Sequence, residues 1–188
     1  MRKFKPDAIP EEIIAEILHA ANTAPCTDTC NYYFGVIQDS QVKHAIAEAT
    51  VYANWVEHAP VIFVCCGLID ADMQDAADGS YVLQGLTGRY SEEIVAALKA
   101  AKDRKAVKTL LQATPVYIAA QHMILTAVAH GLRGCLVDFI HLEQINQILG
   151  LPDHITCQLL VPVGYPDETP RPIKVNEKDN VFFDRWGE

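Results

Sequence analysis

The feature that most constrains the fold is a central segment that is apolar around almost the whole circumference of a helix. Thr114 can cap the predicted helix, Pro115 suits its first position and Gly131 can end it. Its apolar residues are Val116, Ile118, Ala119, Ala120, Met123, Ile124, Leu125, Ala127, Val128 and Ala129. A helix that is apolar on all sides must be buried on all sides. One domain of 188 residues rarely surrounds a helix completely, so we expect a second copy of the chain to cover part of it.

Shorter helices and strands are predicted on both sides of this segment. Apolar spacing and capping residues predict helices over residues 10–24, 42–49, 92–112 and 141–149. Apolar, β-prone runs predict strands over residues 33–37, 61–66 and 157–163, and the continuous apolar character of 61–66 indicates burial on both faces. No internal repeat or long linker divides the chain, so we expect a single domain over residues 1–188.

Charge and hydropathy exclude several classes of protein. The formal net charge is -9 and no cluster of Lys and Arg is present, which argues against binding to nucleic acid. No apolar run approaches the roughly 20 residues that span a bilayer. The first residues do not form a secretory signal, so we expect a cytoplasmic protein whose six cysteines are reduced, with Cys65 and Cys66 in the core.

The common catalytic motifs are absent from the sequence. Cys26 and Cys30 are spaced poorly for a metal or redox pair, so packing within a loop is the preferred interpretation. There is no Gly-x-Ser-x-Gly and no Gly-x-Gly-x-x-Gly, and the run 131–134 fits a helix stop as well as a phosphate cradle. No catalytic side chain is predicted. This is typical of enzymes in which a bound cofactor carries the chemistry.

The short motifs along the chain are more specific as an ordered set than any single one of them. They are Arg2-Lys3-Phe4 with Pro6, Ala24-Pro25, Ala59-Pro60, Gly131-Leu132 with Cys135, Leu149-Gly150-Leu151-Pro152, Val163-Gly164-Tyr165-Pro166 and Asp184-Arg185-Trp186. In this order and at this spacing the chain resembles the nitroreductase family over nearly its whole length. The resemblance implies an α+β fold, a three-layer α/β/α sandwich around a mixed, mostly antiparallel sheet, in a domain-entwined homodimer.

The resemblance also implies a function. Members of the family are FMN enzymes that pass hydride from NAD(P)H to nitro compounds, quinones or other small acceptors. FMN would be the cofactor, NAD(P)H the electron donor and a second copy of the chain the partner, with no metal. A family member that has lost the cofactor and serves as a binding or regulatory domain is the alternative. Residues from about 70 to 112 would form a variable lid over the substrate. The C-terminal residues 176–188 would pack on the partner subunit.

The resemblance assigns roles to particular residues of this chain. Arg2 and Lys174 would hold the FMN phosphate, and Val137 and Asp138 would place backbone N–H groups near the reactive edge of the flavin ring. The ring and ribityl chain would be lined by Pro25, Cys26, Thr27, Thr29 and Asn31. The sequence departs from the family's pattern at several of these positions. Thr29 stands for an Asn, Asn31 for a Gln, Cys26 for a Ser, and Asp138 lies near a position that is usually Gly.

Overall fold

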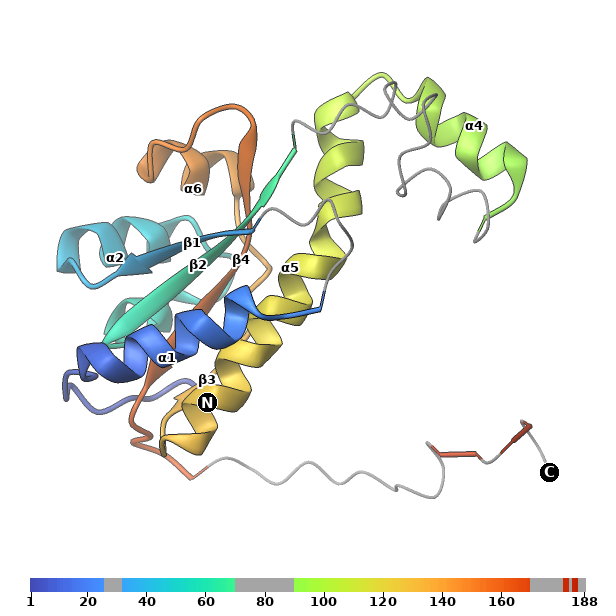
Figure 1. The fold of residues 1–188 in the computed structure, drawn as a ribbon. Helices are drawn as coiled ribbons and strands as arrows, with labels where there is room; N and C mark the ends of the chain where they lie inside the picture. The colour runs from blue at the N-terminus through green and yellow to red at the C-terminus, as the bar shows by residue number, and fades with distance from the viewer. Residues whose placement is uncertain (26–31, 70–89, 170–180, 183, 186–188) are drawn as a thin grey trace.

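The computed structural model describes residues 1–25, 32–69, 90–169, 181, 182, 184 and 185 (Figure 1). Its sheet has four strands in the order β1-β2-β4-β3, and every pairing is antiparallel. The strands are β1 (Tyr32–Ile37), β2 (Val61–Leu68), β3 (Arg133–Gly134) and β4 (Ile155–Gly164). β2 and β4 form the buried centre of the sheet. A register shift between Cys65 and Cys66 interrupts their pairing.

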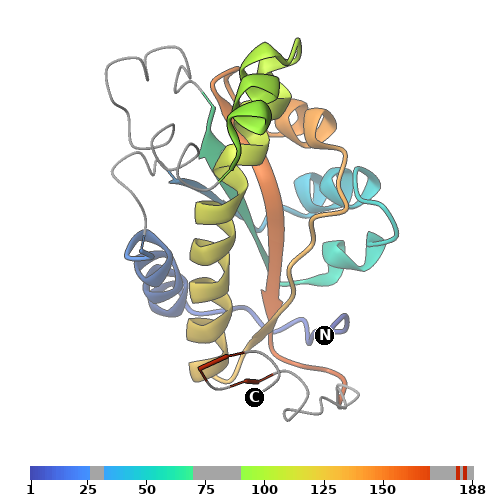
Figure 2. The same cartoon turned by 90° about the vertical axis from the view of Figure 1, so that its right-hand side faces the viewer.

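Helices cover both faces of the sheet and make three layers (Figure 2). One face carries α1 (Glu11–Asn22) and α5 (Arg104–Ala129). The other carries α2 (Ser40–Glu48), the 3-10 helix η1 (Asn54–His58) and α6 (Leu142–Ile148). A further helix, α4 (Glu92–Ala100), precedes α5 in the chain. The predicted α+β class and three-layer sandwich are therefore confirmed, with a sheet that is antiparallel throughout its described part.

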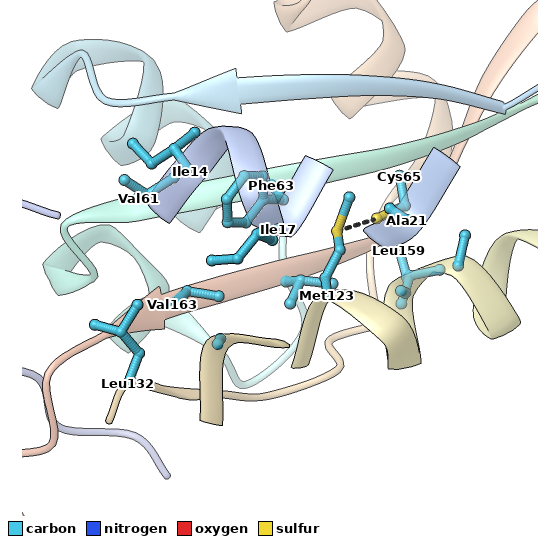
Figure 3. Packing of buried hydrophobic residues seen from close by; sticks show 14 of the residues in the cluster. Ile14, Ile17, Ala21, Val61, Phe63, Cys65, Met123, Leu132, Leu159 and Val163 are labelled. Carbon is cyan, nitrogen blue, oxygen red and sulfur yellow. Dashed lines mark hydrogen bonds between the residues drawn. The ribbon is translucent and has the colours of Figure 1, made fainter. Parts of the chain in front are cut away.

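The core on the first face is formed by α1, α5 and the central strands. Ile14 and Ile17 of α1 and Met123 of α5 pack against Phe63 and Leu159 from the sheet (Figure 3). The thiol of Cys65 donates a hydrogen bond to the Met123 sulfur, 3.7 Å between the two sulfur atoms. Burial raises the pKa of the Cys65 thiol. Cys65 and Cys66 lie in the core as predicted, and behave as small apolar residues.

The start of α5 was predicted wrongly. The helix begins at Arg104, capped by Asp103, whose carboxylate accepts a hydrogen bond from Ala106 N–H at 2.9 Å. Pro115 therefore lies inside the helix rather than at its first position. The predicted helix over residues 92–112 is divided, because α4 ends at Ala100. One strong cap and the packing of the buried face thus outweigh the loss of one helical hydrogen bond at the proline.

The N-terminal segment is fixed to the chain beyond β4. Phe4 pairs with Pro166, Lys5 N–H donates to Tyr165 O at 2.9 Å, and Asp167 N–H donates to Lys3 O at 3.1 Å. Gly164 makes this close approach possible, since a Cβ atom there would lie 3.0 Å from Cδ1 of Phe4 and 2.6 Å from Cδ of Pro60. The N-terminal segment therefore lies beside the chain that leaves the end of β4.

The remaining predicted elements agree with the structure to within a few residues, including Asp39 as the cap of α2 and Gly131, at φ +78°, as the helix stop. η1 and β3 were not predicted. Of the proposed lid over residues from about 70 to 112, residues 70–89 lie outside the described residues, as does most of the C-terminal segment 176–188. Among the helices that the structure describes, none is both long and apolar enough to cross a bilayer.

Candidate cofactor site

A cavity of about 270 Å³ opens between the N-terminal segment and two loops of the second face. One loop leads from α2 into η1, and the other leads from β3 to α6. The lining residues are Arg2, Val51, Tyr52, Ala53, Trp55, Cys135, Leu136, Val137, Asp138 and Phe139. Three residues that the sequence assigned to the cofactor, Arg2, Val137 and Asp138, thus meet at one cavity.

Backbone hydrogen bonds join the two loops. Thr50 and Ile140 form an antiparallel bridge. On either side of it, Val51 N–H donates to Phe139 O at 2.7 Å and His141 N–H donates to Ala49 O at 2.9 Å. Two walls of the cavity therefore form one hydrogen-bonded unit.

Residues 135–138 run alongside β4. Their pairing with β4 determines which of their backbone N–H groups remain without a hydrogen-bond partner. Cys135 N–H donates to Pro162 O at 3.3 Å, and Val137 N–H donates to Leu160 O at 2.9 Å. N–H groups alternate in direction along an extended segment. Those of Leu136 and Asp138 therefore point away from β4, and neither has a partner in the part of the chain that the structure describes. The N–H of Val137 is thus committed to the sheet, and Val137 contributes only its apolar side to the cavity wall.

Among the described residues that line the cavity, Arg2 is the one with a cationic side chain. Its position follows from the N-terminal pairing, which Glu168 reinforces by accepting hydrogen bonds from the backbone N–H groups of Arg2 and Lys3. These hydrogen bonds lower the pKa of the Glu168 carboxyl, and the bond from Arg2 has the larger effect. The backbone of Arg2 is thereby held beside the cavity, and its guanidinium carries five donors that can bind an anion.

Asp138 is connected to the helical layer on the first face. The hydroxyl of Tyr117, on α5, donates to its carboxylate at 3.0 Å. Burial, and then this hydrogen bond, raises the pKa of Tyr117 to about 12. The phenol is therefore protonated at neutral pH and orients the carboxylate of a residue that lines the cavity.

Three aromatic residues of the cavity were not predicted as site residues. Trp55 packs against Phe4, with ring centroids 6.3 Å apart, and holds the floor of the cavity to the N-terminal segment. Tyr52 is 93% exposed and has φ +62°, and Phe139 is 72% exposed. The sequence does place a Tyr and a Trp shortly before Ala59-Pro60. Nothing in their spacing, however, indicates that this loop turns toward residues 135–139.

Of the other predicted site residues, the structure describes only Pro25. Pro25 is exposed and does not line it. Cys26, Thr27, Thr29, Asn31 and Lys174 lie outside the described residues, so their assigned roles stay predictions. Within the ranges that the structure describes, no group of three or more His, Cys, Asp or Glu side chains is arranged to hold a metal ion.

Comparison with known proteins identifies what the chain is similar to. The model of the nitroreductase family matches residues 1–165. A protein of Thermus thermophilus named NADH dehydrogenase is 31% identical over 174 residues, which cover 89% of this chain and 82% of the relative.

Two solved structures show the same fold at lower identity. A nitroreductase family protein from Streptococcus pneumoniae superposes with a TM-score of 0.72 at 18% identity, covering 98% of this chain and 94% of that one. An NADPH:FMN oxidoreductase from Vibrio harveyi, solved with NAD+, gives 0.71 at 22% identity, covering 100% of this chain and 74% of that one.

Proposed function

Because the chain belongs to the nitroreductase family, we propose that it is an FMN-dependent oxidoreductase that passes hydride from NAD(P)H to a nitro compound, a quinone or a similar small acceptor. The observation that carries this proposal is the meeting of Arg2 with the unpartnered N–H groups of Leu136 and Asp138 at one cavity. These are an anion-binding group and two hydrogen-bond donors beside aromatic and aliphatic walls. A flavin presents complementary chemistry, since it has a phosphate, a planar ring and acceptor atoms along one edge.

The donor set of the cavity suits the cofactor. FMN, when bound, supplies the hydride chemistry by taking two electrons from NAD(P)H and giving them to the acceptor. The N–H groups of Leu136 and Asp138 would donate to acceptor atoms of the bound flavin, where preorganised donors stabilise negative charge. Arg2 would bind an anionic part of the cofactor through charge-assisted hydrogen bonds. Tyr117 would keep the Asp138 carboxylate engaged in a hydrogen bond to α5.

The size of the cavity supports a site completed by a second copy of the chain. Its volume of about 270 Å³ lies below the ~300–1,000 Å³ typical of ligand pockets, so it suits one part of FMN rather than the whole molecule. α5 also leaves an apolar surface without cover in the single chain, with Ile118, Leu125 and Val128 exposed. We therefore include a homodimer in the proposal, with α5 at its interface and residues 176–188 packing on the partner.

The absorbance spectrum of the purified protein tests the proposed function. We expect a yellow protein with flavin bands in the near ultraviolet and blue, and FMN released by heating. Arg2→Ala should weaken FMN binding, measured by quenching of flavin fluorescence, by about tenfold to a hundredfold, the range of one lost charged hydrogen bond. A matched control is Lys5→Ala, which removes a neighbouring cation that does not line the cavity. A colourless protein that takes up no added FMN would favour the cofactor-free alternative.

A further inference from the structure

Tyr52 combines two properties that the fold itself does not explain. Its backbone has φ +62°, in the left-handed region where a side chain bearing Cβ is disfavoured and Gly or Asn is common. Its side chain is 93% exposed, so its ring buries almost no surface in the folded chain. The turn would be less strained with Gly, and the core would lose nothing. A strained residue that contributes nothing to the packing of its own chain indicates a functional contact outside it.

The surroundings of Tyr52 indicate what that contact is. Tyr52 lines the cavity, and so does Phe139, which is also largely exposed. The hydrogen bond from Val51 N–H to Phe139 O, at 2.7 Å, holds the backbones of the two loops together directly beside these rings. Two exposed aromatic residues therefore lie on adjoining backbones at one cavity, whose free backbone donors are the N–H groups of Leu136 and Asp138.

We propose that Tyr52 is a specificity-determining residue whose ring stacks on a planar aromatic acceptor, a quinone in the first instance, at the mouth of this cavity. The inference rests on the proposed function for its choice of ligand. Offset stacking between aromatic rings favours the binding of a flat, unsaturated ligand over that of a compact, non-planar one. Tyr52 lines the cavity, and the bridge between Thr50 and Ile140 fixes the backbone of its loop beside residues 135–139.

The test is equilibrium binding of a small naphthoquinone to the FMN-loaded protein, followed by quenching of tryptophan fluorescence, since Trp55 lies in the cavity. Tyr52→Gly removes the ring and relieves the backbone, and Tyr52→Phe keeps the ring. We expect Tyr52→Gly to weaken naphthoquinone binding about threefold to tenfold, the range that corresponds to one aromatic pair, and Tyr52→Phe to bind like the wild type. In Tyr52→Gly the KM for naphthoquinone should also rise. The KM for ferricyanide, which is not planar, should stay within about twofold of the wild-type value.

Three control measurements separate this role from others. Tyr33→Ala removes an exposed tyrosine on β1, away from the cavity, and should leave naphthoquinone binding unchanged. The melting temperature of Tyr52→Gly should not fall, because Gly adopts φ +62° without strain. The sedimentation coefficient of Tyr52→Gly should also match the wild type.

The inference is overturned if Tyr52→Gly binds naphthoquinone as tightly as the wild type. It is equally overturned if the variant loses FMN or the second copy of the chain instead, since the ring then serves one of those contacts. A protein that takes up no FMN yet binds naphthoquinone in a Tyr52-dependent way would contradict the proposed function and keep this inference.

Discussion

At the level of single residues, the chemistry of the cavity depends on which polar groups are already bonded within the fold. Val137 and Asp138 are neighbours in sequence, yet β4 takes the N–H of the first and leaves that of the second. Sequence motifs place both residues near the cofactor but cannot show this difference, because it arises from pairing with Leu160, more than twenty positions away. Tyr117 was likewise predicted only as part of an apolar helix, and its bond to Asp138 depends on how α5 lies against the loop.

The raised pKa of Tyr117 predicts a pH dependence of stability. In the unfolded chain the phenol ionises near pH 10, whereas in the folded chain it keeps its proton to about pH 12. The stabilisation linked to this proton is therefore fully present below pH 10 and is lost as the pH rises toward 12. We expect the free energy of unfolding, measured with urea from pH 9 to 11, to fall more steeply in the wild type than in Tyr117→Phe. Tyr33→Phe is the control and should keep the wild-type slope. Equal slopes in all three proteins would refute the linkage.

At the level of elements, α5 shows where periodicity is informative and where local signals mislead. The apolar run predicts a long buried helix correctly, and Val116, Ala119, Ala120, Met123 and Ala127 do line the core. Pro115 after Thr114 is a typical start signal, but the helix passes through it. Tertiary packing on the sheet and on α1 outweighs the local preference there. β3 could not be predicted from the sequence either. Its two residues show no periodicity, and they form a strand only by pairing with Val163 and Gly164.

Removing the proline from α5 should stabilise the protein. Pro115→Ala restores an N–H that can bond to the carbonyl four residues earlier, and removes the steric conflict of the ring with that turn. We expect the free energy of unfolding to rise by about 1–3 kcal/mol in urea denaturation. Thr114→Ala, the adjacent exposed position, should change it by no more than about 0.5 kcal/mol. A loss of stability in Pro115→Ala would mean that the proline shapes α5 for its packing partners.

At the level of the whole molecule, the single chain has a well-packed sheet between two helical layers but an incomplete outer surface. Leu125 is 59% exposed and Leu110 72%, on a helix whose opposite side is buried in the core. Apolar side chains that recur along one face of a helix mark an interaction surface more often than chance exposure does. Sequence alone indicated this surface, because no arrangement of one domain could bury the helix on every side.

A charge on that surface should separate the two copies of the proposed homodimer. Leu125→Lys adds a cation to the exposed face of α5 without entering the core, so we expect a folded monomer in sedimentation velocity and, with it, loss of bound FMN. Ile148→Lys is a matched control, since Ile148 is 36% exposed on α6, on the opposite face of the sheet (Figure 2). Circular dichroism should show the wild-type helix content in both variants. A Leu125→Lys protein that still sediments as a dimer would place the interface elsewhere.

The pairing of the N-terminal segment with residues 165–168 has a consequence for the order of events during folding. Arg2 is held through contacts with Glu168, 166 positions along the chain. Contacts over such separations form late, because a long loop must close first. During synthesis, Arg2 must therefore wait until Glu168 has left the ribosome before these contacts can hold its backbone in place. If Arg2 binds the anionic part of the cofactor, as we propose, that corner of the site forms late in folding, and a chain cut before Glu168 cannot complete it.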